Sequence, residues 1–349
     1  MLRRTSTDIQ YINILRILAI FAVINVHVST WMAYNITPQT FDWWLGNCVH
    51  AMTLWSIPVF VMVSGALLLD DSGNETPTYF YKKRAQRIVV PLVFWTVFYL
   101  VVRKVVGHEE LTAGYVIKLI LTAEPYYHLW FLYMITGLYL VTPLLRTYIK
   151  HSSSKERISL IVMILILASS YSLINSLVLG NERSIFTIFV PYIGYYLCGY
   201  QLRFIDPRKI SPKYIAAVLI LCVIYTAMLT DVFVKTLGYP NGKFLYDSFS
   251  PPVIVMSIAV FWAAYLISCH AKPLKGFAKV AAERVASATL GIYVLHPIFL
   301  EYIRDRLGKH STDGNFLLGL AVVPVITFIG CYLITSLIMR IPVLRRVVC

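Results

Sequence analysis

Few side chains in this sequence are charged, and few could form a metal site or a disulfide framework. Only 14% of the 349 residues are Asp, Glu, Lys or Arg, and 58% are hydrophobic, whereas a soluble domain has about 25% charged residues. The six cysteines include four that lie inside apolar runs, and no pair has the spacing of metal ligands. We therefore expect a polytopic membrane protein, and a disulfide framework or zinc site is disfavoured.

Signal-peptide features and soluble segments are also missing. No charged segment with a cleavage site precedes the first apolar run, so we expect a retained helix there. The connections between apolar runs reach only about twenty residues, which leaves no room for a soluble domain. The chain is predicted to be all-α and to form a single transmembrane domain over residues 1–349.

Apolar runs long enough to cross a bilayer, which takes about 20 helical residues, predict about ten transmembrane helices. The expected spans are residues 9–33, 44–69, 87–106, 127–146, 158–177, 185–203, 213–231, 250–269, 287–304 and 316–340.

The basic residues are distributed unequally between the two sets of connections. The set that includes the N-terminus and residues 340–349 contains 21 Lys and Arg, and the opposite set contains 9. The positive-inside rule therefore predicts that both termini are cytoplasmic. The net charge of +14 is then topogenic, and no nucleic-acid partner is expected.

The first span carries two ionisable residues, Arg16 and His27, in "NILRILAIFAVINVH". Eleven residues are close to three helical turns, so both side chains project from nearly one face, about 16 Å apart along the axis. Asn13 lies on the same face. Arg16 could snorkel and His27 could bond a neighbouring helix, but together they favour a lined cavity. Histidine is suited to general-base catalysis, and arginine to binding a phosphate or an oxyanion.

Two further segments carry candidate residues on the side expected to be cytoplasmic. Ser64 lies in "IPVFVMVSGALLL", where helix packing is the simpler explanation. Arg84 and Arg87 lie three apart in "YKKRAQRIVVP" and could bind phosphate. Positive-inside anchoring is the alternative for this basic segment, and is preferred for Lys82 and Lys83.

The remaining candidates lie in two further spans. His128, Trp130 and Tyr133 lie at the outer end of one span, in "YYHLWFLYMITG", where His128 is on the same side of the membrane as His27. Tyr293 and His296 lie three apart on one face of another span, in "TLGIYVLHP". An interfacial aromatic belt explains Trp130 without a function. Three histidines within spans are nevertheless a high number for a passive bundle.

These segments, in this order, resemble the acyltransferase-3 family of integral membrane acyltransferases, and the resemblance covers nearly the whole chain. It rests on "YINILRILAIFAVINVH", "IPVFVMVSG", "KKRAQRI", "YHLWFLYMITGLYLVTPLL", "VPYIGYYLCGYQL" and "LGIYVLHP". An Arg followed eleven residues later by a His in the first span is typical of that family. One departure is Asn13, where the family often has an Asp, so an ion pair of this position with Arg16 is not expected.

The resemblance is greatest to the short bacterial enzymes of the enterobacterial common antigen type, which O-acetylate surface glycans in the inner membrane. It implies acetyl-CoA or another acyl-CoA as donor substrate, no permanently bound cofactor, and a hydroxyl of a surface or lipid-linked sugar as acceptor. Membrane lipids are the remaining expected partners.

On this interpretation His27 would deprotonate the acceptor and Arg16 would orient the acyl-CoA or stabilise its thioester oxygen. Arg84 and Arg87 would hold the CoA phosphates, and the acyl group could pass directly or through a covalent intermediate. Two alternative functions remain. The chain could be a transporter or flippase for a polar solute or lipid-linked saccharide, or a structural membrane subunit. Release of free CoA would distinguish the enzyme from both.

Overall fold

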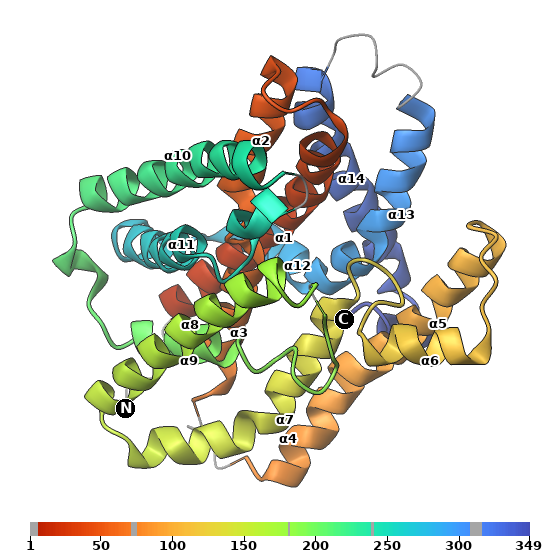
Figure 1. Cartoon of the computed structure of the whole chain (residues 1–349). Helices are drawn as coiled ribbons and strands as arrows, with labels where there is room; N and C mark the ends of the chain where they lie inside the picture. Colours follow the sequence, from red (N-terminus) through yellow and green to blue (C-terminus); the bar gives the residue numbers. More distant parts are fainter. Residues whose placement is uncertain (1–5, 71–74, 181, 239–240, 308–315) are drawn as a thin grey trace.

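The computed structural model describes residues 6–70, 75–180, 182–238, 241–307 and 316–349 (Figure 1). These residues form helices and turns without a strand, which confirms the predicted all-α class. The helices are α1 (Ser6–Asn35), α2 (Phe41–Thr53), α3 (Ser56–Leu68), α4 (Pro77–Arg84), the π-helical turn η1 (Ala85–Val89), α5 (Val90–Val105), α6 (Ala113–Leu121), α7 (Trp130–His151), α8 (Ser154–Leu177), α9 (Ile193–Leu202), η2 (Pro207–Lys209), α10 (Pro212–Leu237), η3 (Asn241–Tyr246), α11 (Pro251–His270), α12 (Gly276–Ser287), α13 (Thr289–Leu307), α14 (Phe316–Ile338) and α15 (Pro342–Arg345).

Helix α1 is the central element of the bundle. Its 30 residues correspond to about 45 Å of helix, which is longer than the hydrocarbon core of a bilayer. It contacts α2, α3, α11, α12, α13 and α14, and Leu15, Ile20 and Ile24 are completely buried in these contacts. Polar residues on α1 are therefore surrounded by several other helices.

The number of candidate spanning helices among the described residues is close to the number expected from the sequence. Among the described residues, eight helical segments are long and apolar enough to cross a membrane, or nine if α12 and α13 are counted as one span with a 62° bend. The prediction of about ten spanning helices is thus met to within one or two helices. The predicted span at 287–304 corresponds to α13. This helix is long and apolar enough to cross a membrane only when it is taken together with α12, from which it is bent.

The predicted span at 185–203 is not a continuous helix. Its first part consists of turns, and α9 has only ten residues. The segment still runs along the bundle, because the Ile185 amide donates to the Leu121 carbonyl at 2.9 Å and the Gln201 amide donates to the Ser154 hydroxyl at 2.8 Å, near the start of α8. Irregular backbone is tolerated at membrane depth where protein covers it or where it lines a cavity.

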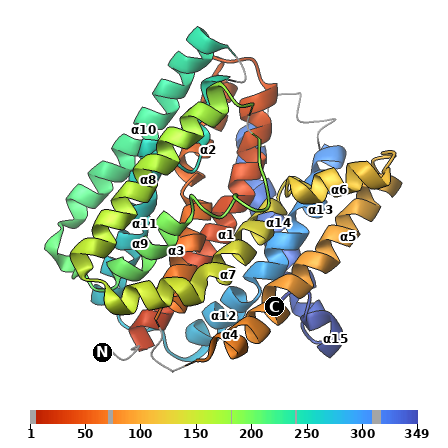
Figure 2. The same ribbon diagram turned by 60° about the horizontal axis from the view of Figure 1, so that its bottom comes forward.

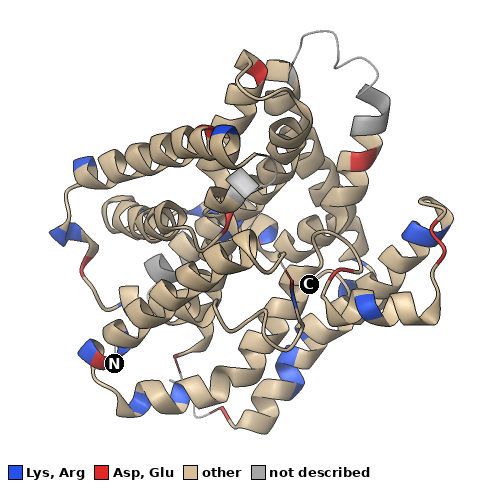
Figure 3. Ribbon diagram, viewed as in Figure 1, with Lys and Arg blue, Asp and Glu red and all other residues tan. Residues whose placement is uncertain are grey.

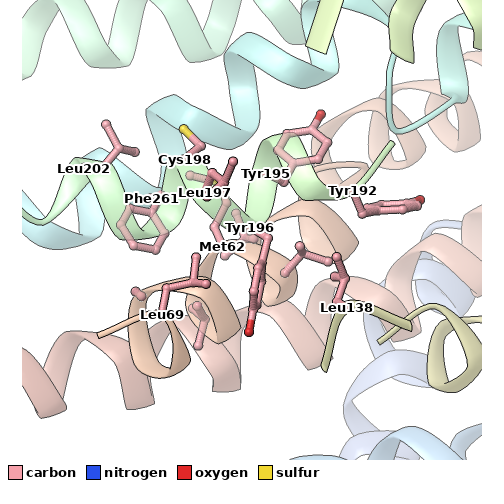
Figure 4. Close-up of a cluster of buried hydrophobic side chains, with 14 of the residues drawn as sticks. Met62, Leu69, Leu138, Tyr192, Tyr195, Tyr196, Leu197, Cys198, Leu202 and Phe261 are labelled. Carbon is pink, nitrogen blue, oxygen red and sulfur yellow. The ribbon is translucent and has the colours of Figure 1, made fainter. Parts of the chain in front are cut away.

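Helices α3 and α9 pack against each other, and Figure 4 shows buried side chains of both helices, such as Met62 and Tyr196, at their contact. A Cβ atom on Gly65 would collide with the backbone of Tyr196, and one on Gly199 would collide with the backbone of Met62. The Tyr196 hydroxyl also hydrogen-bonds the Thr142 hydroxyl at 2.9 Å, which joins α9 to α7. The small residues thus allow a helix crossing that fixes α3, the helix that carries Ser64.

Charged residues concentrate near helix ends and connections, while most of the helical length is uncharged (Figure 3). In Figure 2 the N-terminal end of α1, α4, α12 and α15 lie towards the lower end of the molecule, and α6 lies towards the upper end. The lower end corresponds to the more basic set of connections. A cytoplasmic location for both termini remains a prediction from that asymmetry.

Candidate active site

Two cavities lie beside α1, and each contains one of its two ionisable residues. His27 lines a cavity of about 710 Å³, which we call the histidine cavity. Arg16 lines a second one of about 720 Å³, which we call the arginine cavity. Because the two residues are eleven positions apart on one helix, they are separated by about 16 Å along its axis. They are therefore placed to contact different ligands or opposite ends of one ligand.

Three histidines from different parts of the chain meet at the histidine cavity. The ring centroids of His27 and His296 are 5.0 Å apart, and the rings are stacked. The ring of His128 lies 5.3 Å from that of His296, at 80° to it. His27 belongs to α1, His296 to α13, and His128 to the turn before α7. The sequence predicted that His27 and His128 lie on one side of the membrane, and the fold brings both next to His296.

The turn that contains His128 is held in place by α13. The Tyr293 hydroxyl donates a hydrogen bond to the His128 carbonyl. The Tyr126 hydroxyl donates to the Glu301 carboxylate at 2.5 Å. These two bonds fix the backbone on both sides of the His128 ring, which is 1% exposed.

The hydrogen bonds of the cluster indicate which ring nitrogens can accept a proton. Nδ1 of His296 lies 2.5 Å from the Tyr293 carbonyl oxygen, which can only accept, so Nδ1 carries the proton and Nε2 of the neutral ring has the lone pair. Nε2 of His296 and both ring nitrogens of His128 are buried without a hydrogen-bond partner among the described residues. Buried polar atoms of this kind indicate a ligand or water contact.

The wall of the histidine cavity combines aromatic rings with polar side chains. Trp130, Tyr171 and Tyr192 supply aromatic surface, and Asp247 and Asn175 supply polar groups. The turns that replace the predicted helix at 185–203 also contribute, through Thr187, Ile188, Val190 and Pro191. The irregular segment therefore lies where it lines a cavity, as membrane proteins require of non-helical backbone.

The arginine cavity is lined by five arginines and by no Asp or Glu side chain. These residues are Arg16, Arg84, Arg87, Arg345 and Arg346. The Arg16 guanidinium donates a hydrogen bond to the Thr289 hydroxyl at 2.9 Å. Such a concentration of fixed positive charge in a concave site favours an anionic ligand, above all one that carries phosphate groups.

Arg84 and Arg87 reach the cavity from a π-helical turn. Arg84 ends α4, and Arg87 lies within η1, which also places Gln86 and Ile88 in the cavity wall. The Arg84 guanidinium is 5.4 Å from the Phe80 ring centroid and 6.0 Å from that of Tyr139. Its Nε is buried and has no hydrogen-bond partner among the described residues. π-Helical turns are frequent at functional sites, and this one presents two arginines to one cavity.

The two cavities share part of their walls. Ile57 and Tyr293 line both of them. Tyr293 is buried, and its ring lies 5.3 Å from the His128 ring. A ligand that extended from the arginine cavity towards the histidines would therefore pass Ile57 and Tyr293.

A comparison with protein families is consistent with this geometry. The sequence model of the acyltransferase-3 family, described as an acyltransferase domain, matches residues 9–336. The chain belongs to this family. It is accordingly a multi-pass membrane acyltransferase. No curated protein and no solved structure matches the chain.

Most of the candidates predicted in this acyltransferase-3 chain line one of the two cavities. His27, His128 and Trp130 line the histidine cavity, Arg16, Ser64, Arg84 and Arg87 line the arginine cavity, and Tyr293 lines both. His296 lies behind His27, in ring contact with it. Asn13 and Tyr133 line neither cavity, and the Tyr133 hydroxyl pairs with the Thr96 hydroxyl at 3.0 Å. The catalytic and binding roles predicted for all these residues remain predictions.

The structure adds polar residues that the sequence did not indicate. His50 on α2 lines the histidine cavity, and its Nδ1 lies 3.1 Å from the Ser29 hydroxyl. Its ring contacts the Tyr246 ring, with centroids 4.4 Å apart, and Asp247 follows Tyr246 in the wall. In the sequence these residues are recognisable only as polar residues near apolar runs. Their spacing does not indicate that α2 lies next to the segment before α11.

The three clustered histidines do not form a metal site. Among the described residues, no group of three or more His, Cys, Asp or Glu side chains has a geometry that could hold a metal ion. The rings of His27 and His296 are stacked instead of pointing to a common centre. The cluster in this acyltransferase is therefore better suited to contacts with hydroxyl groups and protons.

Proposed function

We propose that this acyltransferase moves an acetyl or another short acyl group from acyl-CoA to a hydroxyl of a surface or lipid-linked glycan. The donor would occupy the arginine cavity and the acceptor the histidine cavity. The observation that carries the proposal is the pair of cavities with different chemistry that share Ile57 and Tyr293 in their walls.

The arginine cavity suits a CoA thioester better than a free carboxylic acid. CoA has several phosphate groups at one end and a long, weakly polar arm that ends in the thioester. Arginine binds phosphate through a planar, two-pronged array of donors, and five arginines line this cavity. The arm could extend towards Tyr293 while the phosphates stay at the arginines.

The histidine cavity has the side chains that a sugar acceptor would need. The C–H faces of a sugar ring pack against aromatic rings, and its hydroxyls pair with carboxylate, amide and guanidinium groups. Trp130, Asp247 and Asn175 line this cavity, and the Arg183 guanidinium is 5.5 Å from the Trp130 ring centroid. This mixture supports a glycan as the acceptor.

The reaction assigns separate tasks to Arg16 and His27. The acceptor hydroxyl transfers its proton to the His27 imidazole while its oxygen attacks the thioester carbon. The C–S bond breaks, an ester bond forms, and CoA leaves as a thiolate that takes up a proton. Because Arg16 lies about 16 Å along α1 from His27, the separation favours donor orientation for Arg16 over contact with the oxyanion near His27. A transfer through an acyl-enzyme intermediate would use the same residues.

The proposed location is a bacterial inner membrane, with the arginine cavity on the cytoplasmic side, where acyl-CoA is made. The basic connections support this orientation, because Arg84 and Arg345 belong to the set that is rich in Lys and Arg. The histidine cavity would then face the opposite side, where surface glycans are assembled.

Two measurements test the proposal together. Mass spectrometry of surface glycans from cells with and without the gene should show acyl esters that depend on the gene. Membranes that contain the protein should release free CoA from acetyl-CoA when these glycans are added, and membranes with His27→Gln should not. Translocation of a glycan without release of CoA would overturn the proposal and favour a transporter or flippase.

A further inference from the structure

The arginine cavity includes two residues from the last part of the chain. Arg345 ends α15 and Arg346 follows it, and both line the cavity together with Arg16, Arg84 and Arg87. The sequence indicated no role for this pair beyond the positive-inside pattern. Their position next to the proposed donor site suggests a more specific role.

The segment after α14 is fixed against the bundle and is not a loose tail. The Trp95 indole donates to the Val347 carbonyl at 2.8 Å. Val348 is completely buried in a cluster that also contains Leu92, Trp95 and Ile20. These contacts immediately follow Arg346, so they hold the backbone of both arginines at the cavity.

The side chains of Arg345 and Arg346 are exposed and are available to a ligand. Neither forms a salt bridge or a side-chain hydrogen bond with another described residue. By contrast, Arg146 pairs with Glu75 at 3.3 Å. No Asp or Glu side chain lines the cavity, although Cys349 in its wall interacts electrostatically with Arg16. An anionic ligand would further reduce the mutual repulsion of the five guanidinium groups.

Two separate segments supply four of the five arginines of this cavity. Arg84 and Arg87 come from α4 and η1, and Arg345 and Arg346 come from α15 and the residue after it. Both α4 and α15 lie towards the same end of the molecule in Figure 2. Arg16 reaches the cavity from α1, and its side chain is tied to Thr289. A ligand with several phosphate groups could therefore be held from two segments at once.

We propose that Arg345 and Arg346 bind the phosphate groups of the acyl-CoA donor and act with Arg84 and Arg87 as a two-sided clamp. The inference rests on the proposed function and adds the C-terminal segment to the donor site. The ligand chemistry is a phosphate ester. An anionic phospholipid headgroup is a second source of that chemistry, and the experiment below separates the two sources.

The test measures the affinity of CoA for purified full-length protein in nanodiscs of phosphatidylcholine, by calorimetry. Arg345→Gln and Arg346→Gln should each raise the Kd of CoA about 5- to 20-fold, in the range of an exposed hydrogen bond between charged groups. Arg340→Gln is the matched control, because Arg340 is an exposed arginine a few residues earlier that does not line the cavity. It should leave the Kd unchanged.

A donor without phosphate groups provides the second measurement. Acetyl-pantetheine has the thioester arm but lacks the nucleotide phosphates, so Arg345→Gln and Arg346→Gln should leave the rate of its consumption unchanged at a fixed concentration. A rate loss with acetyl-pantetheine equal to the loss with acetyl-CoA would show that the substitutions act on the fold or the chemistry, and would overturn the clamp.

The remaining outcomes separate the clamp from the proposed function. If CoA binds the wild-type protein and both variants with equal Kd, the clamp is wrong and the proposed function stands. If CoA does not bind the wild-type protein, both are wrong. The lipid source is tested by thermal stability in phosphatidylglycerol nanodiscs without CoA. Loss of lipid-dependent stabilisation in the variants, with CoA affinity unchanged, would assign the two arginines to the membrane and overturn the clamp.

Discussion

The imidazole of His27 is stacked on that of His296, with ring centroids 5.0 Å apart and an angle of 29° between the planes. The Nδ1 of His296 is directed to the Tyr293 carbonyl, which leaves Nε2 as the acceptor in the neutral ring. A proton taken up by His27 would therefore lie beside a second imidazole whose orientation is fixed. This arrangement relates α1, which carries the proposed base, to α13, which carries Tyr293 in the wall between the cavities.

Replacement of His27 should stop acyl transfer without unfolding the protein. His27→Gln keeps polarity and much of the side-chain shape but cannot accept a proton at neutral pH, so turnover should fall about 10²- to 10⁴-fold, the usual contribution of a general base. His27→Ala should fail as well. The measurement is acylated glycan produced by purified His27→Gln in liposomes, with size-exclusion chromatography as the control for folding. Near-normal turnover of this variant would reduce His27 to a packing residue.

The rate of transfer should fall as the pH is lowered. A protonated imidazole has no lone pair to accept the hydroxyl proton, so the active form is the neutral one, and activity is lost on the acidic side. The His296 ring contacts the rings of both His27 and His128. Protonation of one ring therefore affects the others, and the loss of activity at low pH would report the titration of the whole cluster. The check is the pH profile of kcat in liposomes buffered equally on both sides. A rate that rose as the pH was lowered, in protein that stays folded, would contradict a histidine base.

The membrane character of the chain and its helical class followed from hydropathy alone, because a bilayer imposes long apolar helices. The exception is residues 185–203, where hydropathy is sufficient for a span but the backbone forms turns and the ten-residue α9. Helix α9 packs on α3, and the turns before it line the histidine cavity. Hydropathy describes the polarity of a segment. It does not indicate which neighbouring groups form hydrogen bonds with the backbone of that segment.

The candidate site was only partly predictable for a similar reason. Spacing on one helix related Arg16 to His27, and a short basic segment pointed to Arg84 and Arg87. Contacts between distant segments have no such signal. The pairing of His27 with His296, 269 positions later, and the approach of Arg345 to the arginine cavity depend on how the helices pack.

Arg87→Lys should weaken use of the donor while it leaves the chemical step intact. Lysine keeps the positive charge but loses the planar array of donors that binds two phosphate oxygens together. The apparent KM for acetyl-CoA should rise about 10-fold, in the range of one hydrogen bond between charged groups, with kcat nearly unchanged. Lys82→Gln is the control, because Lys82 is exposed in the same basic segment and does not line the cavity. A change in membrane orientation with an unchanged KM would favour the anchoring explanation.

The crossing of α3 and α9 should not tolerate a larger residue at Gly199. In Gly199→Ala the new methyl group would overlap the backbone of Met62, so the two helices would have to separate. We expect destabilisation of about 1–3 kcal/mol, as for other overpacked cores, measured as a lower midpoint of thermal unfolding in detergent. Gly114→Ala is the control, because a Cβ atom at Gly114 would meet no atom within 4 Å. Equal midpoints for the two variants would show that α9 can move without cost.

The orientation of the bundle can be tested independently of activity. The distribution of basic residues predicts that Lys209, in η2, is cytoplasmic and that Lys118, in α6, is on the opposite side. In a Cys269→Ser background, which removes an exposed thiol, a membrane-impermeant maleimide should label Lys118→Cys in cells whose outer membrane is permeabilised. It should label Lys209→Cys only after the inner membrane is disrupted. The reverse pattern would place the arginine cavity outside, away from cytoplasmic acyl-CoA. It would contradict both the predicted orientation and the proposed donor site.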